Sequence, residues 1–358
     1  MPHRKHFGNS SVISNPRNTI IAPVISNLQS PILPVSAPVR PPTTGAYWHK
    51  TPFGSLPRRA HSATLVGDEI CIFGGCDRNS CFNTLFVLSP CFYSLTQLST
   101  YGTRPPPLRA HTITPYNDSL ILFGGGDGSN YHNALYLLHH RVWKKIDQKG
   151  DIPSPRRAHT AVLHQPSNSL LLYGGGDGAR ALDDMYSLNL ASWTWSKLSQ
   201  KTRPKSRGYH TADLIGDKMV VTGGSDGVDC FDDIHIYDIK SNSWSLPPLS
   251  TKYKRLSHSS VRVGSYLFIF GGHNGYQYNS ELLLFNLVTL EYETKKIYGS
   301  VPEPRGYASL TLYNNTLYLI GGFDGSTVFD QIYALELGAS AYLSQIDGFQ
   351  VGSGQRSI

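Results

Sequence analysis

Six pairs of adjacent glycines recur along the chain about every 50 residues. The first glycines of the pairs, separated by steps of 50, 50, 49, 48 and 50 residues, are Gly74, Gly124, Gly174, Gly223, Gly271 and Gly321. Thirteen residues before each pair, or fifteen in the third unit, stands a second column, made up of His61, His111, His159, His210, His258 and Ala308. Ten residues after the second glycine stands a third column, made up of Leu85, Leu135, Met185, Ile234, Leu282 and Ile332. Three columns in one register indicate six copies of one structural unit.

Each unit contains a short apolar run that ends in its glycine pair, such as 120–123 and 267–270. Runs of this length are too short for helices and are typical of buried strands. We predict a strand with the histidine column before each run, a third strand after it, and a fourth strand that carries an aromatic residue. The aromatic residues are Tyr93, Trp143, Trp195, Trp244 and Tyr292. The predicted unit is therefore a four-stranded antiparallel meander.

Six such units protect their edges when they stack radially, which makes a β-propeller. Two packed sandwiches are the alternative, and the even spacing disfavours them. The sixth unit ends at Leu337 without a tryptophan strand, whereas Trp48 stands 13 residues before His61, close to the spacing in the other units. We therefore predict that the strand around Trp48 closes the ring beside residues 331–337.

The glycine pairs, the tryptophans of the fourth strand and the aromatic residues of the third strand resemble the kelch repeat. The third-strand aromatic residues are Phe86, Tyr136, Tyr186 and Tyr333. The resemblance covers residues 46–337 and implies an all-β fold, a six-bladed kelch β-propeller closed by an N-terminal strand around Trp48. In kelch propellers the loop face is the usual docking surface for short partner segments, so the resemblance implies the same role for the loop face here. The basic, Ser-rich start that leads into P-R-x-x-H units is similar to fungal cell-end and tip-elongation kelch proteins, which implies cell polarity or cytoskeletal organisation at the cell cortex or tip.

The net charge of +7 is located at the start of the chain, because residues 1–67 hold seven basic residues and no acidic one. Residues 1–45, rich in Pro, Ser and Asn, are predicted to be a disordered basic tail, and residues 338–358 a short C-terminal tail. The body from 68 to 358 is neutral, so we expect no specific nucleic-acid partner. Nucleic-acid binding through the basic tail is an alternative, as is a mitochondrial destination for this acid-free start.

The five cysteines include no C-x-x-C pair, which argues against a zinc ribbon and against a secreted disulfide framework. A cytoplasmic, reducing location fits best, and no apolar run is long enough for a transmembrane segment. Cys71 is expected in a buried strand, while Cys76 and Cys81 flank a turn with no redox or metal role expected.

No pattern of catalytic chemistry is found. The five histidines are expected one to a blade, too far apart to share a metal ion. The sialidase turn and the iron signature of nitrile-specifier proteins are absent, nothing places the Tyr–Cys site of kelch copper oxidases, and the glycines from Gly124 to Gly128 lack the Gly-Lys-Ser/Thr of a phosphate loop. We therefore expect no enzyme, no metal and no cofactor. The alternative is a kelch-type enzyme or small-molecule sensor that uses the central funnel.

Two rings of side chains are predicted on one rim of the propeller. An Arg-rich ring stands three residues before the histidine column, with Arg109 beside Leu108 in the second unit; it comprises Arg58, Arg109, Arg156, Arg207, Arg255 and Arg305. The second ring follows the glycine pairs, and its candidate binding residues are Ser225, His273, Tyr276 and Phe323. Units two and three carry only glycine at this point, so the rim has a bulky side and an open side.

These rings have a structural and a functional interpretation. The arginines can form salt bridges or cap carbonyl groups, and the loop residues can form Asp/Gly turns. Alternatively, guanidinium groups can point into the axial funnel and bind a carboxylate or phosphate on a partner peptide. The predicted function is a non-catalytic scaffold or adaptor for a protein partner, with its oligomeric state left open.

Overall fold

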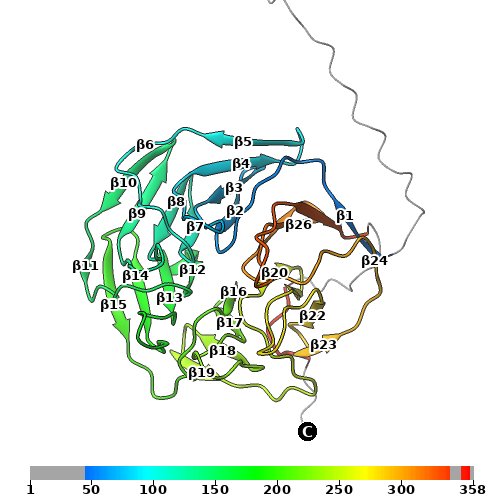
Figure 1. Ribbon diagram of the computed structural model, residues 1–358. Helices are drawn as coiled ribbons and strands as arrows, with labels where there is room; N and C mark the ends of the chain where they lie inside the picture. Colours follow the sequence, from blue (N-terminus) through cyan, green and yellow to red (C-terminus); the bar gives the residue numbers. More distant parts are fainter. Residues whose placement is uncertain (1–44, 339–347, 355–358) are drawn as a thin grey trace, which may run out of the picture. The chain divides into compact units, whose positions relative to one another are not determined.

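The computed structural model describes residues 45–338 and 348–354. Six sheets stand in a ring, so the predicted six-bladed, all-β propeller is confirmed (Figure 1). The predicted N-terminal tail lies outside the described residues except for Gly45. Among the described residues, no helix is long and apolar enough to cross a membrane.

Each blade has four principal strands, numbered here along the chain. Blade one has β2 (Ser62–Val66), β3 (Glu69–Phe73), β4 (Leu85–Ser89) and β5 (Ser94–Leu98). Blade two has β7 (Thr112–Tyr116), β8 (Ser119–Phe123), β9 (Leu135–His139) and β10 (Val142–Ile146). Blade three has β12 (Thr160–His164), the short 3-10 helix η1 (Gln165–Ser167), β13 (Ser169–Tyr173), β14 (Met185–Asn189) and β15 (Thr194–Leu198).

The other three blades follow the same order. Blade four has β16 (Thr211–Ile215), β17 (Lys218–Thr222), β18 (Ile234–Asp238) and β19 (Ser243–Ser245). Blade five has β20 (Ser259–Val263), β21 (Tyr266–Phe270), β22 (Leu282–Asn286) and β23 (Glu291–Glu293). Blade six has β25 (Ser309–Tyr313), β26 (Thr316–Ile320), β27 (Ile332–Glu336) and β1 (Ala46–Lys50).

The strand from the start of the chain closes the ring. β1 pairs antiparallel with β27, and Trp48 lies opposite Leu335 in that register. The Trp48 side chain is 1% exposed, and its ring centroid lies 5.4 Å from that of Phe270 in blade five. The predicted position of this strand beside residues 331–337 is therefore confirmed.

The core lies between the blades, where the fourth-strand tryptophans pack against the second strand of the preceding blade. Trp143 lies 5.1 Å from Phe73, and Trp195 lies 5.1 Å from Phe123, measured between ring centroids. The second strands are apolar at nearly every position because both of their faces are covered. This layering fixes each inner strand against the channel, where the candidate site lies.

The third strands begin where the sequence predicted, since all six residues of the third column open a strand. The prediction for Tyr93 was wrong, because Tyr93 lies in the turn before β5 with a φ of +49° and is 68% exposed. Three short outer strands were not predicted: β6 (Tyr101–Gly102), β11 (Lys149–Gly150) and β24 (Ile297–Gly299). They pair in parallel with β10, β15 and β1.

Residues 348–354 pack against blade five. The backbone N–H of Gly352 donates to the carbonyl oxygen of Leu287 at 2.8 Å, and Phe349 and Val351 join the apolar cluster between blades four and five. This segment belongs to the sequence predicted as a short tail after residue 337.

Candidate partner-binding site at the mouth of the central channel

Six residues directly before the histidine column form a closed ring of backbone hydrogen bonds. They are Ala60, Ala110, Ala158, Tyr209, Ser257 and Tyr307. Each N–H donates to the carbonyl oxygen of its counterpart in a neighbouring blade, at 2.8 to 3.0 Å. All six have a φ between +52° and +58°, a left-handed conformation that side chains rarely adopt outside such constraints. The ring holds the inner ends of all six blades together at the channel.

The histidine column lies next to this ring and joins neighbouring blades through side chains. Nε2 of His111 lies 2.8 Å from the Ser62 hydroxyl, and Nε2 of His159 lies 3.1 Å from the Thr112 hydroxyl. Burial lowers the pKa of both His111 and His159 to about 3, so both are neutral near pH 7. The predicted hydrogen-bonded core role is confirmed at these positions.

Arg156 and Arg207 of the predicted Arg-rich ring point into their own blades. Both side chains are 0% exposed. Arg156 Nη1 donates to Asp184 at 2.7 Å and to the Gly174 carbonyl at 3.0 Å, and Arg207 Nη1 donates to Asp233 at 2.6 Å. Their donors are therefore used within the fold, as in the structural interpretation, although the acids lie just before the third strands and do not belong to the predicted loop ring.

Three more predicted arginines are also buried. Arg255 forms an ion pair with Glu281, and Arg305 pairs with Glu303 at 2.5 Å. The Arg58 guanidinium lies 3.6 Å from the centroid of the Phe82 ring. In the described part of the chain, none of these five arginines lines a channel pocket. Partner binding by these five arginines stays an untested prediction.

The arginines that reach the channel are Arg59, Arg109 and Arg157, which we call the arginine trio. With Tyr209 and Tyr307 they line a cavity of about 120 Å³ at the mouth of the channel. Each arginine of the trio precedes the histidine column by two residues, and therefore comes directly before the hydrogen-bonded ring. Of the six arginines predicted from sequence, the structure brings only Arg109 to this cavity.

Backbone pairing to the loops after the glycine pairs positions the trio. Arg109 and Gly126 exchange two hydrogen bonds of 2.8 and 3.1 Å, and Arg157 and Gly176 exchange two of 3.0 and 2.9 Å. Arg59 is paired in the same way with Cys76. The trio therefore depends on the loops of blades one, two and three.

The trio carries three positive charges, and no carboxylate among the described residues of the cavity lining neutralises them. Arg59 lies over the Phe323 ring at 4.4 Å and Arg157 over the Tyr131 ring at 4.8 Å, so aromatic faces provide part of the support. Burial lowers the pKa of Arg109, and the charges of Arg157 and Arg59 lower it further.

Each arginine of the trio also has a buried nitrogen that lacks a hydrogen-bond partner among the described residues: Arg59 Nε, Arg109 Nε and Arg157 Nη1. A buried unpaired donor is costly, and the cost is larger for a charged group. An anion that enters the cavity would lie among the three guanidinium groups, which are charge-assisted donors.

A groove of about 290 Å³ continues from the trio between blades three and four. Arg157 and Tyr209 line both the groove and the cavity, so the two spaces adjoin. Its lining includes Gly175 and Gly176 of blade three and Gly208 of blade four. It therefore lies between units three and four, and unit three is one of the two units predicted to form the open side of the rim.

The four remaining predicted residues occupy different places. Ser225 lines the groove, and its hydroxyl accepts a hydrogen bond from the Gly227 N–H at 3.0 Å. Phe323 supports Arg59 as described above. His273 Nδ1 accepts from a backbone N–H in its own loop at 3.1 Å, and Tyr276 is 90% exposed at the tip of that loop. The structure thus brings Ser225 and Phe323 close to the trio but leaves Tyr276 in solvent.

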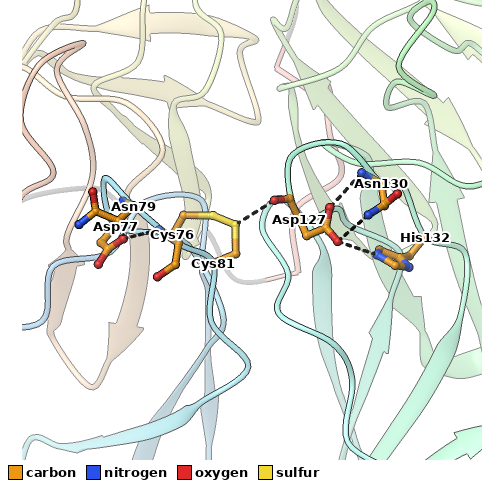
Figure 2. Close-up of a disulfide and its surroundings, with 8 residues drawn as sticks. Cys76, Asp77, Asn79, Cys81, Asp127, Asn130 and His132 are labelled. Atoms are coloured by element: carbon orange, nitrogen blue, oxygen red, sulfur yellow. Dashed lines mark hydrogen bonds and ion pairs between the residues drawn. A yellow bond between two sulfur atoms is a disulfide. The ribbon is translucent and has the colours of Figure 1, made fainter.

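The loop of blade one is linked by a disulfide between Cys76 and Cys81, two cysteines that were expected to flank a turn without a redox role (Figure 2). The Asp77 carboxylate caps the turn by accepting the N–H groups of Asn79 and Ser80 at 2.7 Å. The five-residue spacing of the cysteines did not reveal the pair, because only the loop geometry places both side chains across one β-bridge.

The family profile of the KLHDC2/KLHL20/DRC7 Kelch-repeats domain matches residues 43–141, 110–322 and 250–348. The chain belongs to this Kelch-repeats family. Membership supports a protein-interaction scaffold, and Kelch propellers of this kind are typically non-enzymatic.

Three curated proteins are similar to the chain over segments of 84 to 100 residues. The leucine-zipper-like transcriptional regulator 1 homolog of Drosophila melanogaster is 28% identical over 100 residues, which is 26% of this chain and 10% of that protein. A probable serine/threonine-protein kinase of Dictyostelium discoideum is 29% identical over 84 residues, 22% of this chain and 6% of the kinase. The flagellar outer-arm dynein alpha chain of Chlamydomonas reinhardtii is 25% identical over 97 residues, 27% of this chain and 2% of the dynein chain. The matches thus span a tenth or less of each relative.

In this Kelch propeller, the arginine ring was predicted three residues before the histidine column, whereas the arginines of the trio lie two residues before it. Units one and three contain the doublets Arg58-Arg59 and Arg156-Arg157, and only the second arginine of each doublet reaches the channel. Tyr209 and Tyr307 were also missed, although they occupy the position next to the histidine column. No cluster of three or more His, Cys, Asp or Glu side chains that could hold a metal is found in residues 45–338 and 348–354.

Proposed function

We propose that the propeller is a protein-interaction module that binds an acidic segment of a partner protein at the arginine trio. The observation that carries this proposal is the set of three guanidinium groups, each with an unpaired buried donor, around one cavity. A carboxylate or phosphate accepts hydrogen bonds from such donors with charge assistance, which makes these bonds stronger than neutral ones. The proposed ligand group is therefore anionic.

The shape of the adjoining groove supports a peptide as the bearer of that anion. The cavity of about 120 Å³ accommodates one acidic group, and the groove of about 290 Å³ offers space for neighbouring residues of the same segment. Because five glycines line the groove, a peptide backbone can approach closely there. Tyr131 and Tyr209 give the groove aromatic walls.

A peptide-binding experiment tests the proposal directly. A labelled hexaglutamate peptide, capped at both ends, is titrated with the wild-type protein and with the Arg59→Ala/Arg109→Ala/Arg157→Ala variant, and a capped hexaglutamine peptide is the neutral control. We expect the wild type to prefer hexaglutamate and the variant to bind it about tenfold or more weakly, since three charge-assisted contacts are lost. Added salt should weaken the wild-type interaction.

A matched variant separates the trio from general positive charge. Arg141, Lys144 and Lys145 lie exposed on blade two, and none of them lines the cavity or the groove. Changing these three residues to alanine removes the same charge and should leave peptide binding unchanged. Equal losses in both variants, with both shown to be folded by thermal unfolding, would reject the trio as the binding site.

Affinity purification with the same two variants identifies the natural partner. Proteins lost from the trio variant but retained by the control variant are expected to contain acidic segments. We propose cell polarity or cytoskeletal organisation as the setting, on the sequence resemblance alone. Recovered partners from an unrelated process would reject that setting without affecting the site.

A further inference from the structure

The disulfide of blade one occupies a position that recurs in every blade. Across each loop after a glycine pair, the same two positions form an isolated antiparallel β-bridge. The six pairs are Cys76–Cys81, Gly126–Tyr131, Gly176–Ala181, Ser225–Cys230, His273–Tyr278 and Phe323–Val328. Among the described residues, only the first pair is joined covalently. Five loops therefore keep this geometry without a disulfide, so the fold does not require the bond in blade one.

The linked loop holds one member of the arginine trio. The Arg59 N–H donates to the Cys76 carbonyl at 2.9 Å, and the Cys76 N–H donates back to the Arg59 carbonyl at 3.0 Å. Cys81 is bonded to Cys76 and lies beside blade two, with its sulfur 3.7 Å from the Asp127 carbonyl oxygen (Figure 2). Arg78, in the same loop, donates to the Ser326 carbonyl of blade six at 2.5 Å. The disulfide thus fixes a loop that connects Arg59 to both neighbouring blades.

We propose that thiol–disulfide exchange at Cys76–Cys81 regulates anion binding by the arginine trio, an inference that rests on the proposed function. The oxidised loop holds Arg59 in place, which favours binding because less ordering is required when the ligand arrives. Reduction frees the loop from its covalent link and weakens binding. The site then responds to the redox state of its surroundings.

A dithiol of the thioredoxin or glutaredoxin class is the reductant that opens the Cys76–Cys81 disulfide. Its thiolate attacks the sulfur of Cys81, which is partly exposed, and Cys76, which is 3% exposed, leaves as a thiolate and takes up a proton. The second thiolate of the reductant then attacks the mixed disulfide and releases Cys81 as a thiolate, which is also protonated. Two electrons and two protons pass to the protein, and the dithiol becomes a disulfide.

The first measurement establishes the bond and its local effect. Without reductant, alkylation and mass analysis of the unfolded chain should find three free thiols, Cys71, Cys91 and Cys230, and after reduction five. Hydrogen exchange of the Arg59 and Cys76 amides should be about tenfold or more faster in the reduced protein, because these amides are paired across the linked loop. Gly208 and Ser225 form the same pair in blade four and serve as internal controls.

The second measurement is the affinity for the capped hexaglutamate peptide. We expect reduction to weaken binding about threefold or more, and the Cys76→Ser/Cys81→Ser variant to bind like the reduced wild type whether or not reductant is present. Cys230→Ser, at the equivalent loop position of blade four, should retain the wild-type response. These results together would support the inference.

Other outcomes overturn it in distinguishable ways. Five alkylated thiols before reduction, or equal exchange and equal affinity in both redox states, would reject redox control while leaving the trio as a binding site. Failure of both redox forms and of the trio variant to bind the peptide would reject the proposed function, and the regulation with it.

Discussion

Ala60 donates its backbone N–H to the carbonyl oxygen of Tyr307 at 2.8 Å, which joins blade one to blade six at the channel. At a larger radius, β1 closes the same ring by pairing with β27 in blade six. The propeller is therefore closed both by the inner ring of backbone hydrogen bonds and by a strand from the start of the chain. The inner closure also positions the arginine trio, because each member directly precedes a residue of the ring.

Trp48→Ala should reduce the free energy of unfolding by about 3–5 kcal/mol, because it removes a buried indole from the closing strand. The Trp48 side chain is 1% exposed and packs against Phe270. Urea denaturation measures the change. Phe92→Ala is the control, since Phe92 is 82% exposed and its loss should cost about 0.5 kcal/mol or less. Similar effects of the two changes would contradict the closing role of Trp48.

The buried histidines should make the protein acid-sensitive. Burial lowers the pKa of His111 to about 3 from an ordinary value of 6.5, so the unfolded chain binds a proton below about pH 6.5 that the folded chain excludes until about pH 3. The free energy of unfolding should therefore decrease as the pH is lowered from about 6.5 toward 3, by about 1.4 kcal/mol per pH unit for each such histidine.

His111→Asn should reduce by one the number of protons that the chain takes up when it unfolds in this pH range. We expect the slope of unfolding free energy against pH between about pH 6 and 4 to decrease by about 1.4 kcal/mol per unit, even though the lost contact with Ser62 lowers stability at pH 7. Urea denaturation at several pH values measures the slope. An unchanged slope would show that His111 takes up protons equally in both states.

The repeat register made the blades and the closing strand predictable from sequence, because glycine pairs and apolar columns report burial and turns. The same register could not tell Arg58 from Arg59 or Arg156 from Arg157. Neighbouring side chains on extended backbone point to opposite sides, so a shift of one residue exchanges an interior position for a channel position. The acids that pair with Arg156, Arg207 and Arg255 lie 26 to 28 residues further along the chain, and only the folded blade brings them together.

The second glycine of each pair should be sensitive to a methyl group because of its surroundings. Gly125 has a φ of +92°, and a Cβ there would lie 2.7 Å from the Cβ of His111 and 3.1 Å from the carbonyl oxygen of Arg109. Gly125→Ala should therefore cost about 3 kcal/mol, combining backbone strain with overpacking. Gly227 has a φ of +101°, and a Cβ there would meet no atom within 4 Å, so Gly227→Ala should cost only about 1–2 kcal/mol. Equal losses of stability in thermal or urea unfolding would show that crowding at Gly125 is relieved by local movement.

The pair of Arg207 and Asp233 should stabilise the fold only when both partners are present. Arg207 is 0% exposed, and its Nη1 lies 2.6 Å from Asp233 Oδ1. Burial by itself would raise the pKa of Asp233, but hydrogen bonds from His235 and Arg207 outweigh burial and hold this pKa well below its usual range. The carboxylate therefore contributes stability above about pH 4, and this contribution is lost as the pH falls toward the lowered pKa.

Arg207→Met should lower the unfolding free energy by about 3–5 kcal/mol at pH 7, since it leaves the Asp233 carboxylate without its guanidinium partner. The double variant Arg207→Met/Asp233→Leu should recover much of this loss, because an apolar pair replaces the broken ion pair. Arg203→Met is the control: Arg203 pairs with Asp183 at 3.3 Å but is 42% exposed, and this change should cost about 0–1 kcal/mol. A double variant no more stable than Arg207→Met in urea denaturation would show that Arg207 acts mainly through the Gly223 carbonyl, which it also caps at 2.8 Å.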